Sequence, residues 1–290
     1  MKSLTKRQKN RINACIFAAL TYAAMREVMG FLLGWFMPGG EMLRLAVNAL
    51  VNFLALFLPC LVILVLEPMG NRQLRLRPCK KGTVWFWLPI FLGGGALVNL
   101  ASLLLRPLDH SAQEILPGGL GPMGMVFLIY CVIPAVGEEL LFRGIMEGIL
   151  TPCGKGVAIF LPALFFSLLH GRVTQGFVAF FTGLFLGWLA WRQGSILPGM
   201  ALHFVNNLIA VVEIYLTQFA SWELAAAFQW FHFIFWPVAG GILLVKGIRR
   251  GILKREAPQP ESPGPFTVFT VPACGLTAAG LLLLQLMGNF

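Results

Sequence analysis

Two adjacent carboxylates, Glu138 and Glu139, interrupt one of the most apolar stretches of the chain, residues 131–143. An ionisable group inside a membrane costs about 2.5 to 3.5 kcal/mol even on the lenient insertion scale, so it marks a functional site by default. Helical residues four apart share a face, and sequence neighbours point about 100° apart. Glu139 therefore shares a stripe with Arg143 and Glu147, whereas Glu138 has no cation on its face. The spacing indicates a structural Glu139 and a chemical Glu138, although structural pairing of both explains them equally well.

Two further apolar segments carry isolated polar groups. His170 is the only titratable side chain of residues 163–171, and a histidine at a helix end is more often a packing residue than a catalytic one. His203 and Asn207 lie one turn apart in a helix that opens with Pro198. Two donors on one face suit the stabilisation of a developing oxyanion. Hydrogen bonding between helices explains the same pair.

Together these groups have the parts of a hydrolase that activates water: a carboxylate base, a histidine that orients or shares the proton, and a His/Asn pair that holds negative charge. His110, in an expected external loop, and His232, in an aromatic run, are left out of this set. The six cysteines are dispersed, with no C-x-x-C motif and no histidine nearby in sequence. Neither a disulfide framework nor a metal site is therefore expected from them.

The elements that must position these groups are membrane helices. The 290 residues are 58% hydrophobic and 12% charged, with a mean hydropathy of +0.79, whereas a soluble domain is about 25% charged. About 20 apolar residues span a bilayer. The sequence predicts roughly nine such segments, at 12–36, 43–66, 83–105, 122–147, 156–170, 175–191, 197–219, 226–248 and 266–288. The expected fold is an all-α, polytopic membrane helix bundle of about eight or nine transmembrane helices.

One hydrophilic segment, rich in Pro, Glu and Ser, divides the chain. We expect a transmembrane bundle over residues 1–253, a cytoplasmic linker over 254–265 and an accessory C-terminal transmembrane helix over 266–290. The first span does not resemble a cleavable signal peptide, because it is long, contains Arg26 and Glu27, and is followed by no small-residue cleavage site.

Charge placement predicts the orientation. If the spans alternate, about 18 of the 22 basic residues fall on one side, only Arg44, Arg106 and Arg172 fall on the other, and Arg26 lies within the first span. Because Lys and Arg accumulate on the cytoplasmic side, we expect a multi-pass protein of the cell membrane with a cytoplasmic N-terminus. The net charge of +10 then reflects topology and not nucleic-acid binding, with contact to anionic lipid as the functional alternative.

The expected depths of the polar groups disagree. At 1.5 Å per residue, Glu138 and His170 both lie ~23 Å from the turn at residues 151–154. His203 lies only about 8 Å from the same face if every span is straight and complete. Either the helix at residues 175–191 is short or tilted, or the chain re-enters the membrane after it.

Three polar motifs follow one another on successive apolar helices. They are Glu138-Glu139-x-x-x-Arg143, Phe166-x-x-x-His170 and His203-x-x-x-Asn207. In this order they resemble the signature of the CPBP family, the CAAX-protease and bacteriocin-processing membrane proteins, also called Abi-type. That family includes the type II CAAX prenyl endopeptidases. The resemblance covers about residues 120–215, the core of the expected bundle.

This resemblance implies an intramembrane glutamic endopeptidase. By that resemblance Glu138 and His170 activate water, and His203 with Asn207 forms the oxyanion site. Glu139 and Arg143 match motif positions with a mainly structural, supporting role. The implied partners are the lipid bilayer and a membrane-associated peptide or protein substrate, with no nucleic acid and no cofactor.

Two other classes of function use the same buried residues. A metal-dependent protease would use the Glu and His side chains as ligands, but the sequence lacks an H-E-x-x-H helix, in which two histidines one turn apart bind zinc. A non-catalytic membrane scaffold or a transporter would use the charges to fix helix register or to line a pathway. Transporters often contain internal repeats, and the sequence shows none.

Overall fold

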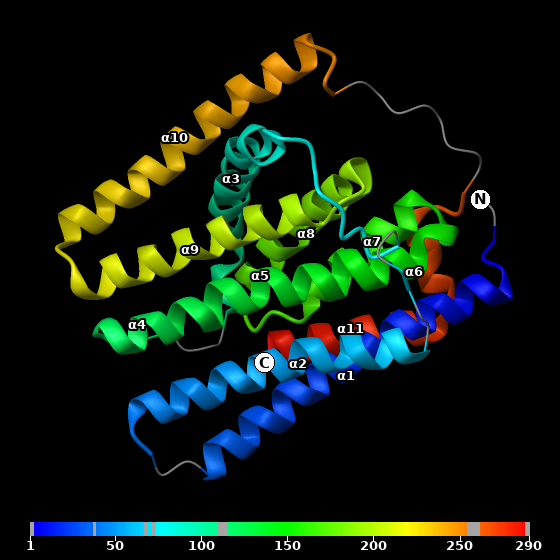
Figure 1. The fold of residues 1–290 in the computed structure, drawn as a ribbon, viewed down its shortest axis with the longest axis horizontal. Helices are drawn as coiled ribbons and strands as arrows, with labels where there is room; N and C mark the ends of the chain where they lie inside the picture. The colour runs from blue at the N-terminus through cyan, green and yellow to red at the C-terminus, as the bar shows by residue number, and fades with distance from the viewer. Residues whose placement is uncertain are drawn as a thin grey trace.

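The computed structural model describes residues 3–36, 39–66, 69–70, 73–109, 115–253 and 262–287. Within these ranges each expected apolar segment contains a helix and no strand occurs, so the fold is an all-α bundle (Figure 1). The single helices are α1 (Lys6–Phe36), α2 (Glu41–Leu66), α3 (Thr83–Ser102), α7 (Lys155–Leu168), α8 (Val173–Gln193), α9 (Leu197–Phe219), α10 (Trp222–Arg249) and α11 (Pro272–Leu286). Most of the expected linker, residues 254–261, lies outside the described residues.

Six stretches of the described chain are long and apolar enough to cross a bilayer. They are Glu41–Val65, Thr83–Leu108, Leu120–Cys153, Val173–Gln193, Leu197–Phe219 and Trp222–Arg249. Helices α7 and α11, with 14 and 15 residues, are shorter than the ~20 residues that a full crossing needs. The polytopic helical bundle expected from the sequence is confirmed, with these shorter apolar helices beside the candidate spans.

The span from Leu120 to Cys153 is one rod with several changes of helix type. It consists of α4 (Leu120–Phe127), the π-helix η2 (Leu128–Val132), α5 (Ile133–Glu138), the π-helix η3 (Glu139–Met146), α6 (Glu147–Leu150) and the 3-10 turn η4 (Thr151–Cys153). Pro134 accounts for the first change, because proline has no N–H to donate to the carbonyl of Tyr130. The second π-helix begins at Glu139, so the two glutamates lie on either side of a junction between helix types. Such π-helical segments are frequent at functional sites.

The bundle packs around this rod. The α1–α2 hairpin lies along one side, and α7, α8 and α9 lie against the others, with α10 outside α3 and α9 (Figure 1). Helices α3 and α10 approach closely at Gly93 and Gly240, where an added Cβ would meet the backbone of the other helix. Small residues allow this close approach of helix backbones in a membrane. The 3-10 helices η1 (Leu103–Leu108) and η5 (Pro265–Thr270) complete the described elements.

The turn between α8 and α9 removes the mismatch in depth. Its residues Ser195 and Ile196 are fully buried, and the Ile196 N–H donates to the carbonyl of Arg75 in the α2–α3 loop at 3.1 Å. Ile196 lies level with Gly144, because a Cβ on that glycine would be 3.5 Å from Ile196 Cδ1. Gly144 precedes the end of the rod at Cys153 by about 14 Å at 1.5 Å per residue. The chain thus turns back inside the protein, and α9 starts at the depth of the glutamates although α8 is full length.

Candidate active site

Glu139 is the anchor of a buried ion pair. Its Oε1 accepts a hydrogen bond from Arg143 Nη1 at 2.7 Å, as the four-residue spacing predicts, and lies 3.1 Å from His203 Nδ1. Glu139 and Arg143 are 0% and 1% exposed. The other carboxylate oxygen, Oε2, lies against the first turn of α9, where a Cβ on Gly199 would come within 2.9 Å of it. The positive end of the α9 dipole therefore also faces this carboxylate.

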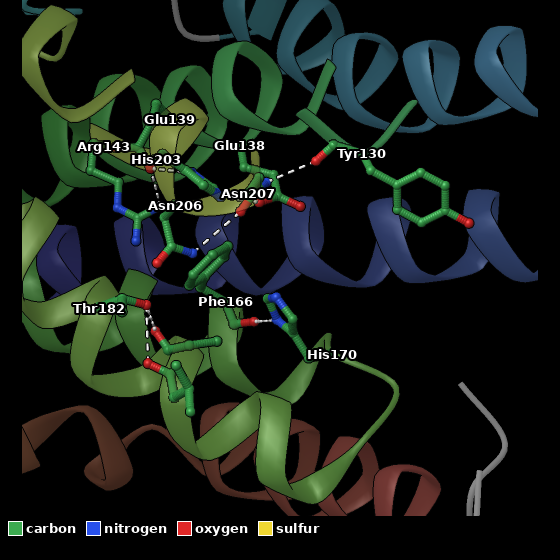
Figure 2. A network of polar contacts seen from close by, with 12 residues as sticks. Tyr130, Glu138, Glu139, Arg143, Phe166, His170, Thr182, His203, Asn206 and Asn207 are labelled. Carbon is green, nitrogen blue, oxygen red and sulfur yellow. Dashed lines mark hydrogen bonds and ion pairs between the residues drawn. The ribbon is translucent and has the colours of Figure 1, made fainter. Parts of the chain in front are cut away.

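His203 lies between the two glutamates (Figure 2). Because a carboxylate only accepts, the contact at Glu139 places a proton on His203 Nδ1 and turns Nε2 toward Glu138. The distance from Nε2 to Glu138 Oε2 is 3.6 Å. The Glu138 side chain is 13% exposed, in contrast to the sealed Glu139. The pairing of Glu139 with Arg143 is thus as the four-residue spacing predicts, Glu138 is the more accessible carboxylate, and the histidine beside Glu138 is His203.

Asn207 binds the carbonyl to which Pro134 cannot donate. Its Nδ2 donates to the Tyr130 carbonyl at 3.0 Å, which joins α9 to the first π-helix (Figure 2). The amide keeps a second N–H proton for another acceptor. Asn206, which an ideal helix turns about 100° away, still has its Nδ2 3.5 Å from Asn207 Oδ1. The two asparagines are therefore weakly coupled.

His170 follows the end of α7, where it reaches the site from the opposite side of Phe166 (Figure 2). Its Nδ1 donates to the Phe166 carbonyl at 2.6 Å, which leaves Nε2 as an acceptor. The Phe166 ring lies edge-on to both histidines, with centroid distances of 4.8 Å to His170 and 5.9 Å to His203. The Arg143 guanidinium lies over the same ring at 4.4 Å. Phe166 therefore sets the spacing between the three polar motifs.

Two residues missed by the sequence reasoning hold the turn that carries His170. Gln285 of α11 is 5% exposed, and its Nε2 lies 2.9 Å from the His170 carbonyl, 3.1 Å from that of Arg172 and 3.3 Å from that of Ser167. Arg26 of α1 donates to the Leu169 carbonyl at 2.6 Å. Carbonyls at a helix end lack a partner within the helix, and Gln285 and Arg26 supply donors to those of His170 and Leu169.

The charged stripe of the rod continues away from the site. Glu147 is 1% exposed and forms an ion pair with Arg75 of the α2–α3 loop. The Arg75 guanidinium also lies 5.1 Å from the centroid of the Trp191 ring. This second buried pair compensates the charge of Glu147, which touches none of the candidate catalytic side chains.

Two cavities meet at these residues. One, of about 390 Å³, is lined by Glu138, His170, His203 and Asn207. The other, of about 330 Å³, extends between α3, α8 and α9 and is also lined by the two histidines and Asn207. The structure thus brings all four predicted catalytic side chains to one cavity, although only Glu138 and His203 approach each other closely.

The remaining histidines stay apart from this site. His232 is 7% exposed and contacts the Phe233 ring at a centroid distance of 5.5 Å, which fits the packed role expected for it. His110 lies outside the described residues.

Comparison with known proteins gives one match. Residues 121–209 match the model of the family described as type II CAAX prenyl endopeptidase Rce1-like. Comparisons with the curated proteins and with the solved structures give no match. The matched range contains the whole polar set from Glu138 to Asn207 and agrees with the 120–215 core. This confirms the family that the three motifs resemble: within a multi-pass membrane protein, the segment that carries the candidate active site matches the Rce1-like type II CAAX prenyl endopeptidase family.

Proposed function

We propose that the protein is an intramembrane peptidase in which Glu138 activates water for hydrolysis of a peptide bond, without a metal ion. The observation that carries this proposal is the single cavity lined by Glu138, His170, His203 and Asn207. These side chains come from the rod, the α7–α8 turn and α9, so the fold brings together segments that are far apart in sequence. The family match supports a protease-type hydrolase as the reaction class.

The attacking water binds between Glu138 and His170. Glu138 accepts a proton from this water, and His170 Nε2 accepts a hydrogen bond from the second O–H of the same water. The other ring nitrogen of His170, Nδ1, is held by the Phe166 carbonyl. A general base positioned in this way contributes about 10²- to 10⁴-fold to the rate. After attack, Glu138 returns the proton to the leaving amine, which completes hydrolysis.

The oxyanion of the tetrahedral intermediate binds on the α9 side of the cavity. Asn207 offers its second N–H, since the first is held by the Tyr130 carbonyl. His203 supplies the second contact from Nε2, with its ring held by the Glu139 carboxylate through Nδ1. A donor fixed in advance costs no reorganisation during the reaction, and one such donor is worth about 10²- to 10³-fold in kcat.

Glu138→Gln is the decisive variant, because the amide keeps the shape of the side chain but cannot accept a proton from water. We expect hydrolysis to fall by several orders of magnitude while the purified protein unfolds at the wild-type temperature. Glu213→Gln is the matched control, since Glu213 lies on α9 and lines neither cavity. The assay compares the peptides released from membranes that contain each variant. Wild-type hydrolysis by purified Glu138→Gln protein would contradict the glutamate mechanism.

The two alternative functions predict other outcomes. A metal-dependent protease would lose activity on exhaustive chelation, whereas the proposed mechanism retains it. Among the residues that the structure describes, no group of three or more His, Cys, Asp and Glu side chains could hold a metal ion. A scaffold or transporter would keep its cellular phenotype in the Glu138→Gln variant as long as the protein folds.

A further inference from the structure

Both cavities open toward the same end of the bundle. Along the rod, the lining residues run from Phe142, beside the glutamates, to Ile129, which lies close to α4. Along α9 they run from His203 to Ile214, toward the end of that helix. A lining residue of α2, Asn48, lies near the start of its helix. We call the two cavities together the well, and the end at which it opens the hairpin end, because α1 and α2 are joined there.

A third cavity continues the well toward the outside. It has a volume of about 380 Å³, shares Asn48 with the well and reaches Glu41 and Arg44 at the first turn of α2. The α7–α8 turn also borders the well, since His170 and Gly171 line it.

The opposite end of the well is closed. Arg143, Ile145 and Met146 of the rod are at most 1% exposed, and Ser195 and Ile196 of the α8–α9 turn are fully buried. Within the described part of the chain, no rod residue beyond Phe142 lines either cavity. We call these five buried residues the floor. They separate the catalytic groups from the end of the bundle at which α1 begins.

Basic residues mark the closed end. Its described elements carry Lys6, Arg7, Lys9, Arg11, Arg75, Arg77, Lys80, Lys81, Lys155, Arg192, Lys246, Arg249 and Arg250. The described hairpin end has three basic residues, Arg44, Arg106 and Arg172, and a fourth, Arg26, lies further in, at the wall of the well. The acidic residues of this end include Glu41, Asp109 and Glu223. Since Lys and Arg accumulate on the cytoplasmic side of membrane proteins, the closed end faces the cytoplasm.

We infer that the well opens on the extracytoplasmic side of the membrane, and that the substrate is a polypeptide segment presented there, from an exported protein or the outer part of a membrane-anchored one. The identity of the substrate rests on the proposed peptidase function, whereas the sidedness of the well rests only on the cavities and the charges. Asn48, Asn52 and Gln175 bring side-chain amides to the wall of the well. An amide both donates and accepts, so it can bind the N–H and C=O groups of an extended peptide.

Cysteine labelling tests the sidedness. Ala210 lines both cavities and is exposed, as is Gln175, so Ala210→Cys and Gln175→Cys place a thiol in the well. Cys79 in the α2–α3 loop is the internal control, because the other five native cysteines are buried. In intact cells, a membrane-impermeant maleimide is expected to label both introduced thiols and to label Cys79 only after permeabilisation. Labelling of Cys79 in intact cells, with the introduced thiols labelled only after permeabilisation, would overturn the inference. So would the absence of labelling in the well under both conditions.

A second measurement separates the sidedness from the peptidase function. Labelling is repeated on Glu138→Gln protein that also carries Ala210→Cys, where it is expected to be unchanged. In the Ala210→Cys single variant, the impermeant reagent added to right-side-out vesicles is expected to block peptide release, whereas the same reagent trapped inside them is not. If Glu138→Gln protein hydrolyses normally, the proposed function fails while the labelling result stands. If the trapped reagent alone blocks release, the extracytoplasmic substrate fails while the peptidase function stands.

Discussion

Glu139→Gln separates the two tasks of the buried carboxylate. The amide has nearly the same shape, but it removes the negative charge that Arg143 Nη1 contacts at 2.7 Å and His203 Nδ1 at 3.1 Å. Hydrogen bonds to charged groups contribute about 1.5–3 kcal/mol each. Removing one member of a buried ion pair costs about 3–5 kcal/mol, because the other charge stays buried. The two lost hydrogen bonds and the broken ion pair are two ways to count the same change. Each predicts that the free energy of unfolding falls by about 3–5 kcal/mol.

The double variant Glu139→Gln/Arg143→Met decides whether charge or orientation matters for activity. Replacing both partners removes the stranded cation, so most of the lost stability is expected to return. The methionine keeps a contact with the Phe166 ring in place of the guanidinium. Hydrolysis is not expected to return, since a neutral amide does not restore the negative charge beside His203 Nδ1. In the Ser-His-Asp triad the corresponding Asp-to-Asn change lowers kcat by about 10⁴-fold, and we expect a loss of about 10²- to 10⁴-fold.

The measurements are denaturant unfolding in detergent and hydrolysis at constant pH. Glu147→Gln is the matched control, because Glu147 is equally buried and paired with Arg75 but does not touch His203. It is expected to lower stability by a similar amount and to leave the activity of the folded fraction intact. Recovery of both stability and hydrolysis in the double variant would refute the reasoning, because it would reduce Glu139 to a partner of Arg143 alone.

The other predictions concern the oxyanion site and the α7–α8 turn. Asn207→Ala is expected to lower kcat by about 10²- to 10³-fold with little change in KM, because the free N–H of Asn207 binds mainly the transition state. Asn206→Ala is the comparison. An equal loss of kcat in that variant would contradict the assignment to Asn207. Gln285→Leu is expected to lower kcat by about 10- to 100-fold, with folding retained, since it removes the side-chain donor from the His170 carbonyl. An equal loss of kcat in the control Leu283→Ala, on the exposed side of α11, would show that α11 acts only through general packing.

The sequence predicts the parts of the fold that depend on local physics. Apolar length alone locates the helices, and the four-residue spacing predicts the contact between Glu139 and Arg143 that the structure shows. The contrast between Glu139, which has a cation on its face, and Glu138, which has none, follows from the same spacing. These features need only one helix and its surroundings, so a single sequence contains enough information for them.

The contacts between helices were not predictable in the same way. That His203 lies beside both glutamates depends on the buried turn at Ile196, which sets the depth of α9 through a hydrogen bond to the distant α2–α3 loop. The contact from Gln285 to the His170 turn joins residues more than a hundred positions apart. One signal was present in the sequence: Pro134 cannot donate to the Tyr130 carbonyl, which favours a polar side chain such as Asn207 nearby.

The floor of the well has a consequence for the membrane as an insulator. Water that reaches Glu138 thins the low-dielectric layer at this point, where a bilayer elsewhere has about 30 Å of hydrocarbon. The membrane potential, worth about 2.3 kcal/mol per elementary charge for each 100 mV, then falls mainly across the remaining sealed layer. That layer contains the five floor residues, each of which is at most 1% exposed. They are Arg143, Ile145, Met146, Ser195 and Ile196. The same side chains that support the glutamates thus keep protons and ions from leaking through the protein.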